Sequence, residues 1–271
     1  MDDFFSRVRD TRRPIHATAP LSKNSFVPLA MRSRPLLLPE IEDMNPTEHD
    51  IAGMFDLVSG RYDLLNHVLS GYTDVRWRKK AIGMSLRSGV KDVLDVSTGT
   101  GDMAIGYERA GSGVHVYGLD ISMEMLRIAR TKAGLGTGGV RLIRGSGLSL
   151  PFRDGTFDLV SCAFGIRNIY PREQGIREFY RVLRPGGGIA ILEFSMPPGA
   201  FGRIYRLYFD RVLPLLGNLI SGTRAYTYLT SSVRAFPVQA TFTRMLASEG
   251  FRDIEITALT HGIAALYSGK K

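Results

Sequence analysis

The stretch VKDVLDVSTGTGDMAIGYERA, residues 90–110, contains a strand pattern, a glycine-rich turn and a helix pattern in immediate succession. Residues 90–96 are rich in aliphatic side chains, which favour a short buried strand. The turn STGTGD then supplies glycines, which tolerate the tight backbone conformations needed between a strand and a helix. This order predicts the first half of a βαβ unit, which belongs to a parallel sheet.

The same alternation of short strands and helices continues along the chain. The helix pattern SMEMLRIARTKA follows the second strand pattern, and PREQGIREFYRVL follows the fourth. The last two strand patterns are close together, as in an antiparallel pair at the edge of a sheet. The strands that we predict are 90–96, 114–120, 140–146, 157–164, 188–195, 253–259 and 262–269. We therefore expect an α/β fold with a doubly wound, Rossmann-like sheet of seven strands, mostly parallel with an antiparallel edge strand.

Helical segments and an irregular arm accompany these strands. From Ile51 onward, apolar residues recur at helical spacing across two or three short helices, which predicts an N-terminal helical cap. A helical insertion at about 199–235 follows the fifth strand. Residues 1–43 contain many prolines and no regular period, so we expect a disordered or draped arm before one domain at 44–271. The methionine at Met44 leaves open that the true start lies there.

The composition is that of a globular protein with excess positive charge. The net charge of +9 raises nucleic acid or an anionic membrane surface as partners. No stretch approaches the roughly 20 apolar residues that span a bilayer, and no signal-peptide core is present. The single cysteine, Cys162, lies in an apolar strand pattern, which predicts an unreactive core thiol and a reducing compartment. We expect a cytoplasmic protein and leave open both a place at the inner face of the membrane and a homodimer.

The glycine-rich turn predicts a ligand site. Gly99, Gly101 and Ala104 satisfy the dinucleotide fingerprint, so spacing alone does not separate NAD from S-adenosylmethionine. A pyrophosphate prefers amide donors without nearby carboxylates, yet Asp95 and Asp102 bracket this turn. A ligand with an ammonium and a sulfonium tolerates these carboxylates better, which favours S-adenosylmethionine. The alternative is that the glycines only form a tight turn. No spacing of His, Cys and Glu indicates a metal.

The positions of several residues predict specific contacts with S-adenosylmethionine. Thr100 can offer its N–H or hydroxyl to the methionine carboxylate, and Asp120 can accept from both ribose hydroxyls. Met123 is placed to pack on the adenine face, and the turn at Ser146 and Gly147 to meet the adenine edge. The residues predicted to bind the donor are Asp95, Gly99, Thr100, Gly101, Asp120, Ile121, Met123, Ser146, Gly147 and Phe164.

Two longer stretches carry a resemblance to a known family. FDLVSGRYDLLNHVLSGYTDVRW (55–77) and RVLRPGGGIAILEFS (181–195) resemble signatures of class I S-adenosylmethionine-dependent methyltransferases, specifically the quinone C-methyltransferases of ubiquinone and menaquinone biosynthesis. The resemblance implies C-methylation of a prenylated quinol ring, with naphthoquinol and benzoquinol both open. The chain departs from the family at Asp74, where a histidine is usual, at Ser146, where Asn or Asp is common, and at Ala163, where serine is common.

The stretch FGIRN, residues 164–168, closes the fourth predicted strand, where a doubly wound sheet places its ligand crevice. Arg167 would supply a permanent cation beside a developing phenolate, and Asn168 a hydrogen bond. We predict both as catalytic, with a water held between them as the proton acceptor. An ordinary ion pair is the alternative for Arg167. Tyr62, Asp63 and Tyr226 are predicted to line the ring pocket, while His67 and His261 are expected to be structural.

The insertion at 199–235 combines arginines with leucines and aromatic residues. It fits an amphipathic lid at a membrane interface that admits a polyprenyl tail, or an ordinary capping helix pair. Other functions remain open: a divergent small-molecule methyltransferase, a nucleic-acid methyltransferase and a non-catalytic scaffold that binds S-adenosylmethionine. We expect no nucleic-acid partner, because FGIRN stands where an amine-presenting Asn/Asp-Pro-Pro-aromatic run would be needed.

Overall fold

The computed structural model describes residues 47–134, 139–221 and 225–271. The predicted arm at 1–43 and the alternative start at Met44 lie outside these ranges. Within them, none of the helices is long and apolar enough to cross a membrane.

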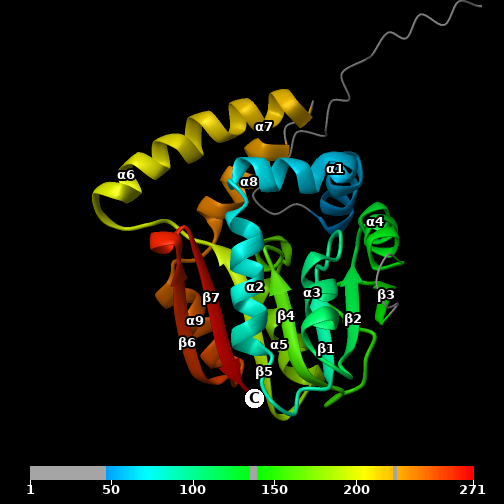
Figure 1. Ribbon diagram of the computed structural model, residues 1–271. Helices are drawn as coiled ribbons and strands as arrows, with labels where there is room; N and C mark the ends of the chain where they lie inside the picture. Colours follow the sequence, from blue (N-terminus) through cyan, green and yellow to red (C-terminus); the bar gives the residue numbers. More distant parts are fainter. Residues whose placement is uncertain (1–46, 135–138, 222–224) are drawn as a thin grey trace, which may run out of the picture. The chain divides into compact units, whose positions relative to one another are not determined.

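One seven-stranded sheet forms the centre of the domain, with the strand order β3-β2-β1-β4-β5-β7-β6 (Figure 1). The strands are β1 (Asp92–Val96), β2 (His115–Asp120), β3 (Val140–Arg144), β4 (Phe157–Ala163), β5 (Leu183–Phe194), β6 (Arg252–Leu259) and β7 (Ala264–Lys270). The first five pair in parallel, which confirms the predicted doubly wound sheet. The two closing strands form the predicted antiparallel pair, with β7 between β5 and the edge strand β6.

Helices on both faces of the sheet bury its apolar side chains. Trp77 on α2 (Thr73–Ser85) and Met103 on α3 (Asp102–Ala110) pack on one face. Phe179 on α5 (Arg172–Val182) and Phe242 on α9 (Gln239–Ser248) pack on the other. Because β1 and β4 are covered on both sides, their sequences read as nearly continuous apolar runs. Cys162 is fully buried on β4, and burial raises the pKa of its thiol well above the ordinary value, as expected for an unreactive core residue.

A second group of helices lies over the carboxyl ends of the parallel strands (Figure 1). It comprises α1 (Glu48–Leu69), α6 (Gly199–Leu207), a π-helical turn (Tyr208–Val212), α7 (Leu213–Ser221) and α8 (Ala225–Ala235). The predicted cap of two or three short helices consists of two, α1 and α2, and α1 is longer than expected, with 22 residues. A small separate core holds the later helices together, made of Phe209, Leu213, Tyr226 and Val233. The remaining helix, α4 (Met123–Gly134), packs against α1 and against β3.

Candidate active site

The turn after β1 has three residues with left-handed backbone, Ser97 at φ 55°, Gly99 at φ 56° and Gly101 at φ 86°. Glycine adopts this region without strain, which explains two of the three positions. The turn is fixed to its neighbour because the Thr98 N–H donates to the Leu119 carbonyl at 3.0 Å. At the end of β4, a side chain on Gly165 would approach the Ser97 Cβ to 2.4 Å, so the two loops pass in close contact.

Asp95 lies beneath this turn and not in front of it. Its carboxylate accepts hydrogen bonds from the Thr98 hydroxyl at 2.6 Å and the Ser161 hydroxyl at 2.7 Å. Burial raises the pKa of Asp95 to about 6, despite these two donors. The side chain contributes to neither of the two cavities described below. Asp95 therefore holds the turn in place and does not face a ligand in either cavity.

A first cavity, which we name the polar cavity, opens in front of the turn. The residues that line it are Glu48, Ile51, Phe55, Tyr62, Ser97, Gly99, Leu119, Asp120, Ile121, Met125, Gly145, Gly147, Ala163, Phe164, Gly165, Asn168 and Ile169. Asp120 accepts from the N–H groups of Gly99 at 2.7 Å and Ser122 at 2.9 Å, one on each oxygen. Burial raises the pKa of Asp120, and the backbone donors oppose that rise. Each oxygen keeps acceptor capacity for a hydroxyl of a bound ligand.

Some of the residues that we predicted to bind S-adenosylmethionine line this cavity together, and others lie outside it. Gly99, Asp120, Ile121, Gly147 and Phe164 line it together.

Three predicted residues have other surroundings. The Thr100 hydroxyl donates to Asp63 at 2.6 Å, and Gly101 packs beside Ala129 as it begins α3. Met123 is 38% exposed and does not line the cavity, whereas Met125, two residues further along the chain, does. Because α4 begins at Met123, the helix turns residue 125 inward and residue 123 toward solvent, and this geometry does not support the adenine contact predicted for Met123.

Helix α1 covers the polar cavity and is tied down by three carboxylates. Glu48 accepts from the Ser146 hydroxyl, and Asp56 accepts from the Ser122 hydroxyl at 2.5 Å. Asp63 accepts from Thr100 and also from Lys132 on α4 at 2.9 Å. The side chain of Ser146 is thereby bonded to α1, and the side chain of Asp63 to Thr100 and to α4. The sequence analysis missed this role, although residues 48, 51, 55 and 62 share one helical face and could have indicated it.

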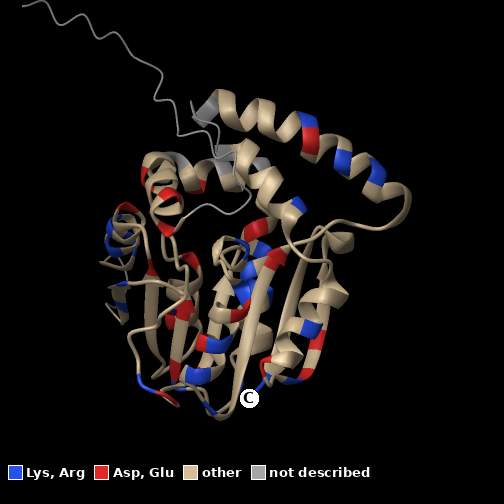
Figure 2. Ribbon diagram, turned by 180° about the vertical axis from the view of Figure 1, so that it is seen from behind, with Lys and Arg blue, Asp and Glu red and all other residues tan. Residues whose placement is uncertain are grey.

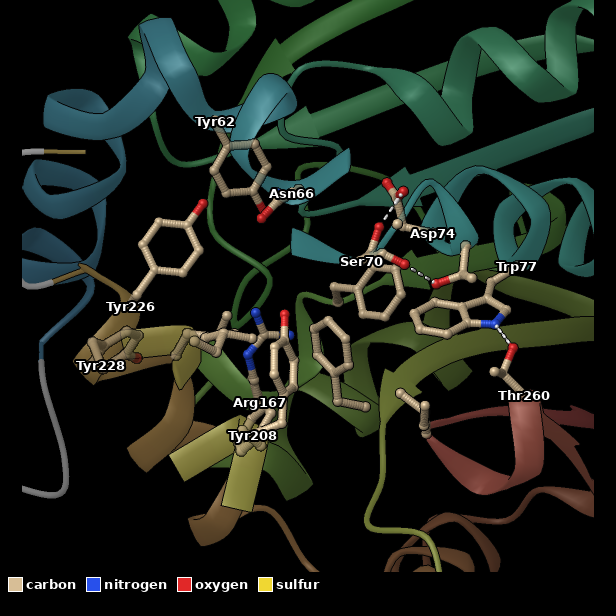
Figure 3. Close-up of a pocket in the computed structure, with 18 of the residues that line it drawn as sticks. Tyr62, Asn66, Ser70, Asp74, Trp77, Arg167, Tyr208, Tyr226, Tyr228 and Thr260 are labelled. Atoms are coloured by element: carbon tan, nitrogen blue, oxygen red, sulfur yellow. Dashed lines mark hydrogen bonds between the residues drawn. The ribbon is translucent and has the colours of Figure 1, made fainter. Parts of the chain in front are cut away.

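A second cavity of about 320 Å³, the apolar cavity, lies beside the first (Figure 3). Its walls come from α1, α2, the ends of β4 and β5, the helices α6 to α8 and the segment after β6. Among its lining residues are Met54, Phe55, Val58, Tyr62, Asn66, Ser70, Asp74, Trp77, Arg78, Phe164, Arg167, Phe194, Tyr205, Tyr208, Phe209, Leu213, Tyr226, Tyr228, Thr260 and Ile263. Phe55, Tyr62 and Phe164 line both cavities, which therefore meet. The predicted pocket residues Tyr62 and Tyr226 are present in the apolar cavity, and Asp63 is not.

Arg167 reaches the apolar cavity from a 3-10 turn after β4 (Ile166–Asn168). Its Nη1 donates to Glu193 at 2.7 Å, and Glu193 is fully buried. Burial alone lowers the pKa of the guanidinium, but the attraction of Glu193 outweighs it and holds that pKa above its ordinary value. The Arg167 Nε is buried without a hydrogen-bond partner among the described residues. An ion pair thus anchors Arg167, whose side chain brings a permanent positive charge to the wall of the cavity.

Asn168, its neighbour in sequence, faces the polar cavity. Its Oδ1 accepts from the Tyr228 hydroxyl at 3.0 Å. The structure therefore separates the two side chains that we expected to share one water, because the 3-10 turn directs consecutive residues to different sides. The predicted water between Arg167 and Asn168 is not supported.

The comparisons with known proteins agree along the length of the chain. The family model described as the ubiE/COQ5 methyltransferase family matches residues 43–271. A protein named demethylmenaquinone methyltransferase from Thermus thermophilus is 47% identical over 220 residues, which cover 80% of this chain and 100% of the relative. A protein named ubiquinone/menaquinone biosynthesis C-methyltransferase UbiE from Syntrophotalea carbinolica is 43% identical over 229 residues, which cover 84% of this chain and 96% of the relative.

A solved structure from Thermotoga maritima shares the fold. It is described as a SAM-dependent methyltransferase, possible histamine N-methyltransferase, and superposes with a TM-score of 0.59 over 82% of this chain and 99% of that chain. The two sequences are 17% identical, so this likeness shows the fold alone. From the family model and the two relatives, which match over nearly their whole length, we conclude that the chain belongs to the ubiE/COQ5 methyltransferase family.

Proposed function

We propose that this methyltransferase transfers the methyl group of S-adenosylmethionine to a ring carbon of a prenylated quinol. The observation that carries the proposal is the meeting of two unlike cavities at Phe55, Tyr62 and Phe164. One contains a buried carboxylate and glycines and suits a polar donor, while the other is mainly apolar and suits a ring with a hydrocarbon tail. Methyl transfer is an in-line displacement, so the chief requirement is that donor and acceptor are aligned.

The polar cavity would hold the donor. When bound, S-adenosylmethionine supplies the electrophilic methyl group. Asp120 would accept from the ribose hydroxyls with its free lone pairs, and Gly99 and Gly147 allow the backbone to approach. Ile121 and Phe164 would pack on the ligand, with Met125 in place of Met123. For Asp95, Thr100, Gly101 and Ser146 we propose a positioning role, because they hold the turn and α1 in place.

The apolar cavity would hold the ring. Arg167 would place its positive charge beside the ring oxygen that becomes a phenolate, which stabilises the negative charge in a water-poor site. Tyr62 and Tyr226 would line the ring. Asn168, whose partner Tyr228 lines the apolar cavity, would link the two cavities. We propose a naphthoquinol over a benzoquinol, on the name and identity of the Thermus relative.

The helices α6 and α7 would act as a lid that also rests on a lipid surface. Tyr205, Phe209 and Leu213 face the cavity, whereas Ile204 and Leu215 are 71% and 70% exposed. Arginines at 203, 206 and 211 accompany these apolar residues, and Figure 2 shows the basic residues of α6. Apolar residues among arginines match an anionic membrane, from which a prenyl tail could enter. We therefore propose a cytoplasmic enzyme that works at the inner face of the membrane.

Methyl transfer from a labelled donor to a short-tailed demethylmenaquinol tests the proposal. We expect label in the quinol and none in RNA offered at low salt. Transfer only to a benzoquinol would show that the acceptor is a benzoquinol and not the naphthoquinol that we propose. Donor binding without transfer to either quinol would contradict the proposal and favour a scaffold. A deletion strain analysed by mass spectrometry should accumulate demethylated quinone.

A further inference from the structure

Only one carboxylate lines the apolar cavity among the residues that the structure describes. The charged lining residues are Asp74, Arg78 and Arg167, and the rest are apolar, aromatic, hydroxyl-bearing or amide side chains or glycine. Methylation of a quinol ring needs a group that takes up a hydroxyl proton, and neither arginine can do so near neutral pH. The lining phenols Tyr62, Tyr205, Tyr208, Tyr226 and Tyr228 have pKa values raised first of all by burial, so they remain protonated.

Asp74 is buried and held by three donors. Its Oδ2 accepts from Arg78 Nη1 at 2.5 Å and lies 2.8 Å from His67 Nδ1, while its Oδ1 accepts from the Ser70 hydroxyl at 2.8 Å. A carboxylate has about four acceptor positions, so this arrangement leaves one on Oδ1. Only 3% of the residue is exposed to solvent. Figure 3 shows Asp74 beside Ser70 at the wall of the cavity, across from Arg167.

The surroundings keep this carboxylate ionised. Burial by itself raises the pKa of Asp74, but Arg78, Ser70 and His67 together outweigh burial and lower it. His67 lies on α1, Arg78 on α2 and Ser70 in the turn between these two helices. A carboxylate that is ionised at neutral pH has a lone pair for a proton, and because its lowered pKa makes it a weak base, the transfer depends on Arg167 and Arg78 stabilising the phenolate that forms.

The contacts of Asp74 extend in two directions, through Arg78 to the place where the two cavities meet and through His67 to the protein surface. The Arg78 guanidinium that contacts it lies over the ring of Phe164 at 5.3 Å, and Phe164 lines both cavities. On the other side, the His67 ring stacks on Tyr72 at 5.5 Å, and Tyr72 is exposed. The His67 side chain itself is 22% exposed.

We propose that Asp74 accepts the proton of the ring hydroxyl next to the methylated carbon, with His67 as a positioning residue that orients its carboxylate; this rests on the proposed quinol methylation. The O–H bond breaks and its electron pair stays on the ring oxygen, beside the positive charge of Arg167. The ring carbon then bonds to the methyl carbon as the C–S bond breaks, with that electron pair leaving on sulfur. The ring C–H proton passes to water, and Asp74 returns its proton to the ring oxygen. One proton is released for each methyl group transferred.

A purely structural role for Asp74 makes a different prediction. The same contacts would then only brace the turn between α1 and α2, and a change would lower the melting temperature without a specific loss of turnover. The substitution Asp74→Asn keeps the shape and removes the proton acceptor. The matched control is Asp92→Asn, because Asp92 also contacts a histidine, His115 at 3.1 Å, and an arginine, Arg184 at 2.8 Å, outside both cavities.

We expect Asp74→Asn to lower kcat for the demethylmenaquinol about 100-fold or more, the lower range for loss of a general base, with donor affinity within threefold of wild type. Asp74→Glu, which keeps a carboxylate, should retain more activity than Asp74→Asn. His67→Gln should lower kcat about tenfold and leave KM nearly unchanged. Asp92→Asn should behave as wild type.

Turnover of Asp74→Asn within threefold of wild type would overturn the inference. If Asp74→Asn does not fold, Asp74→Glu and His67→Gln decide: unchanged kcat in His67→Gln, or loss of donor binding in parallel with turnover in Asp74→Glu, would contradict it. If wild type does not methylate the quinol at all, the proposed function fails first. If wild type, Asp92→Asn and Asp74→Asn are all active, only the role of Asp74 fails.

Discussion

At the scale of single residues, the pair Arg167 and Glu193 combines a structural contact with the chemical role that we propose for Arg167. The two charges are buried and 2.7 Å apart, and the removal of either leaves the other without compensation. Loss of one partner of a buried pair costs about 3–5 kcal/mol, whereas a well-packed apolar pair can replace both with little loss. The stability of the fold and the activity of the site can therefore be separated by mutation.

We predict that Arg167→Ala and Glu193→Ala each lower the free energy of unfolding by about 3–5 kcal/mol. The double variant Arg167→Met with Glu193→Leu should recover most of this stability but not turnover, because the positive charge beside the ring oxygen is lost. Urea unfolding and the methyl-transfer assay measure the two quantities. As a control, Arg177→Ala breaks an exposed pair with Glu249 and should cost no more than about 1 kcal/mol. Recovery of turnover in the double variant would contradict the proposed role.

Asp120 provides the corresponding test in the polar cavity. Asp120→Ala removes the acceptor for two backbone N–H groups and for the proposed ribose hydroxyls. We expect donor affinity in calorimetry to fall at least about 100-fold, since loss of a charged hydrogen-bond partner costs roughly 1.5–3 kcal/mol per bond. Asp253→Asn, at an exposed pair with Lys270, is the control and should bind the donor normally. Unchanged donor affinity in Asp120→Ala would place the donor elsewhere.

At the scale of elements, the continuous run from α6 through the π-helical turn to α7 presents two unlike faces. One face supplies Tyr205 and Phe209 to the apolar cavity. The other exposes Ile204, Leu207 and Leu219, the last at 77%. A helix that packs only on its own domain would not need apolar residues on both sides.

We therefore predict that the charge reversal Arg203→Glu with Arg206→Glu reduces binding to vesicles containing anionic lipid at least tenfold, because each basic residue near such a surface contributes about 1 kcal/mol. Flotation of the protein with vesicles measures this, and added salt should weaken wild-type binding. Arg244→Glu on α9 serves as the control on a different helix. Donor affinity should not change in either variant. Equal binding of all three proteins would exclude α6 as the docking helix.

At the scale of the whole molecule, Asp95 couples the central sheet to the pH dependence of folding. Its pKa is raised by burial from 3.8 to about 6 in the folded protein. The folded state therefore binds this proton more tightly than the unfolded state. The resulting stabilisation is fully present below pH about 4 and is lost as the pH rises through about 6, a difference of about 3 kcal/mol.

We predict that Asp95→Asn removes this dependence. The free energy of unfolding of the variant minus that of wild type should increase between pH 4.5 and 7, by up to about 3 kcal/mol. Urea unfolding at several pH values measures the difference. Asp92→Asn, at a partly exposed position, should give a difference that varies far less over the same range. A flat difference for Asp95→Asn would show that the carboxylate is not desolvated as described.

The sequence by itself determined the order of strands and helices, the glycine turn with Asp120, the position of FGIRN at the carboxyl end of β4 and, through its signatures, the family. These features are local, because strand periodicity, turn chemistry and short motifs depend on residues a few positions apart. The closing antiparallel pair could be predicted for the same reason, since β6 and β7 are separated by only a few residues.

Only the tertiary structure decided which predicted side chains reach a ligand. Asp63 and Thr100 are 37 residues apart in sequence, yet their side chains bond to each other and line neither cavity. Glu193 on β5 neutralises Arg167, and the packing of α2 places Asp74 in the wall of the apolar cavity. Such pairings depend on how distant elements pack, and a buried charge must find its partner wherever the fold supplies one. The motif shows where the chemistry takes place, and the packing decides which groups are free to perform it.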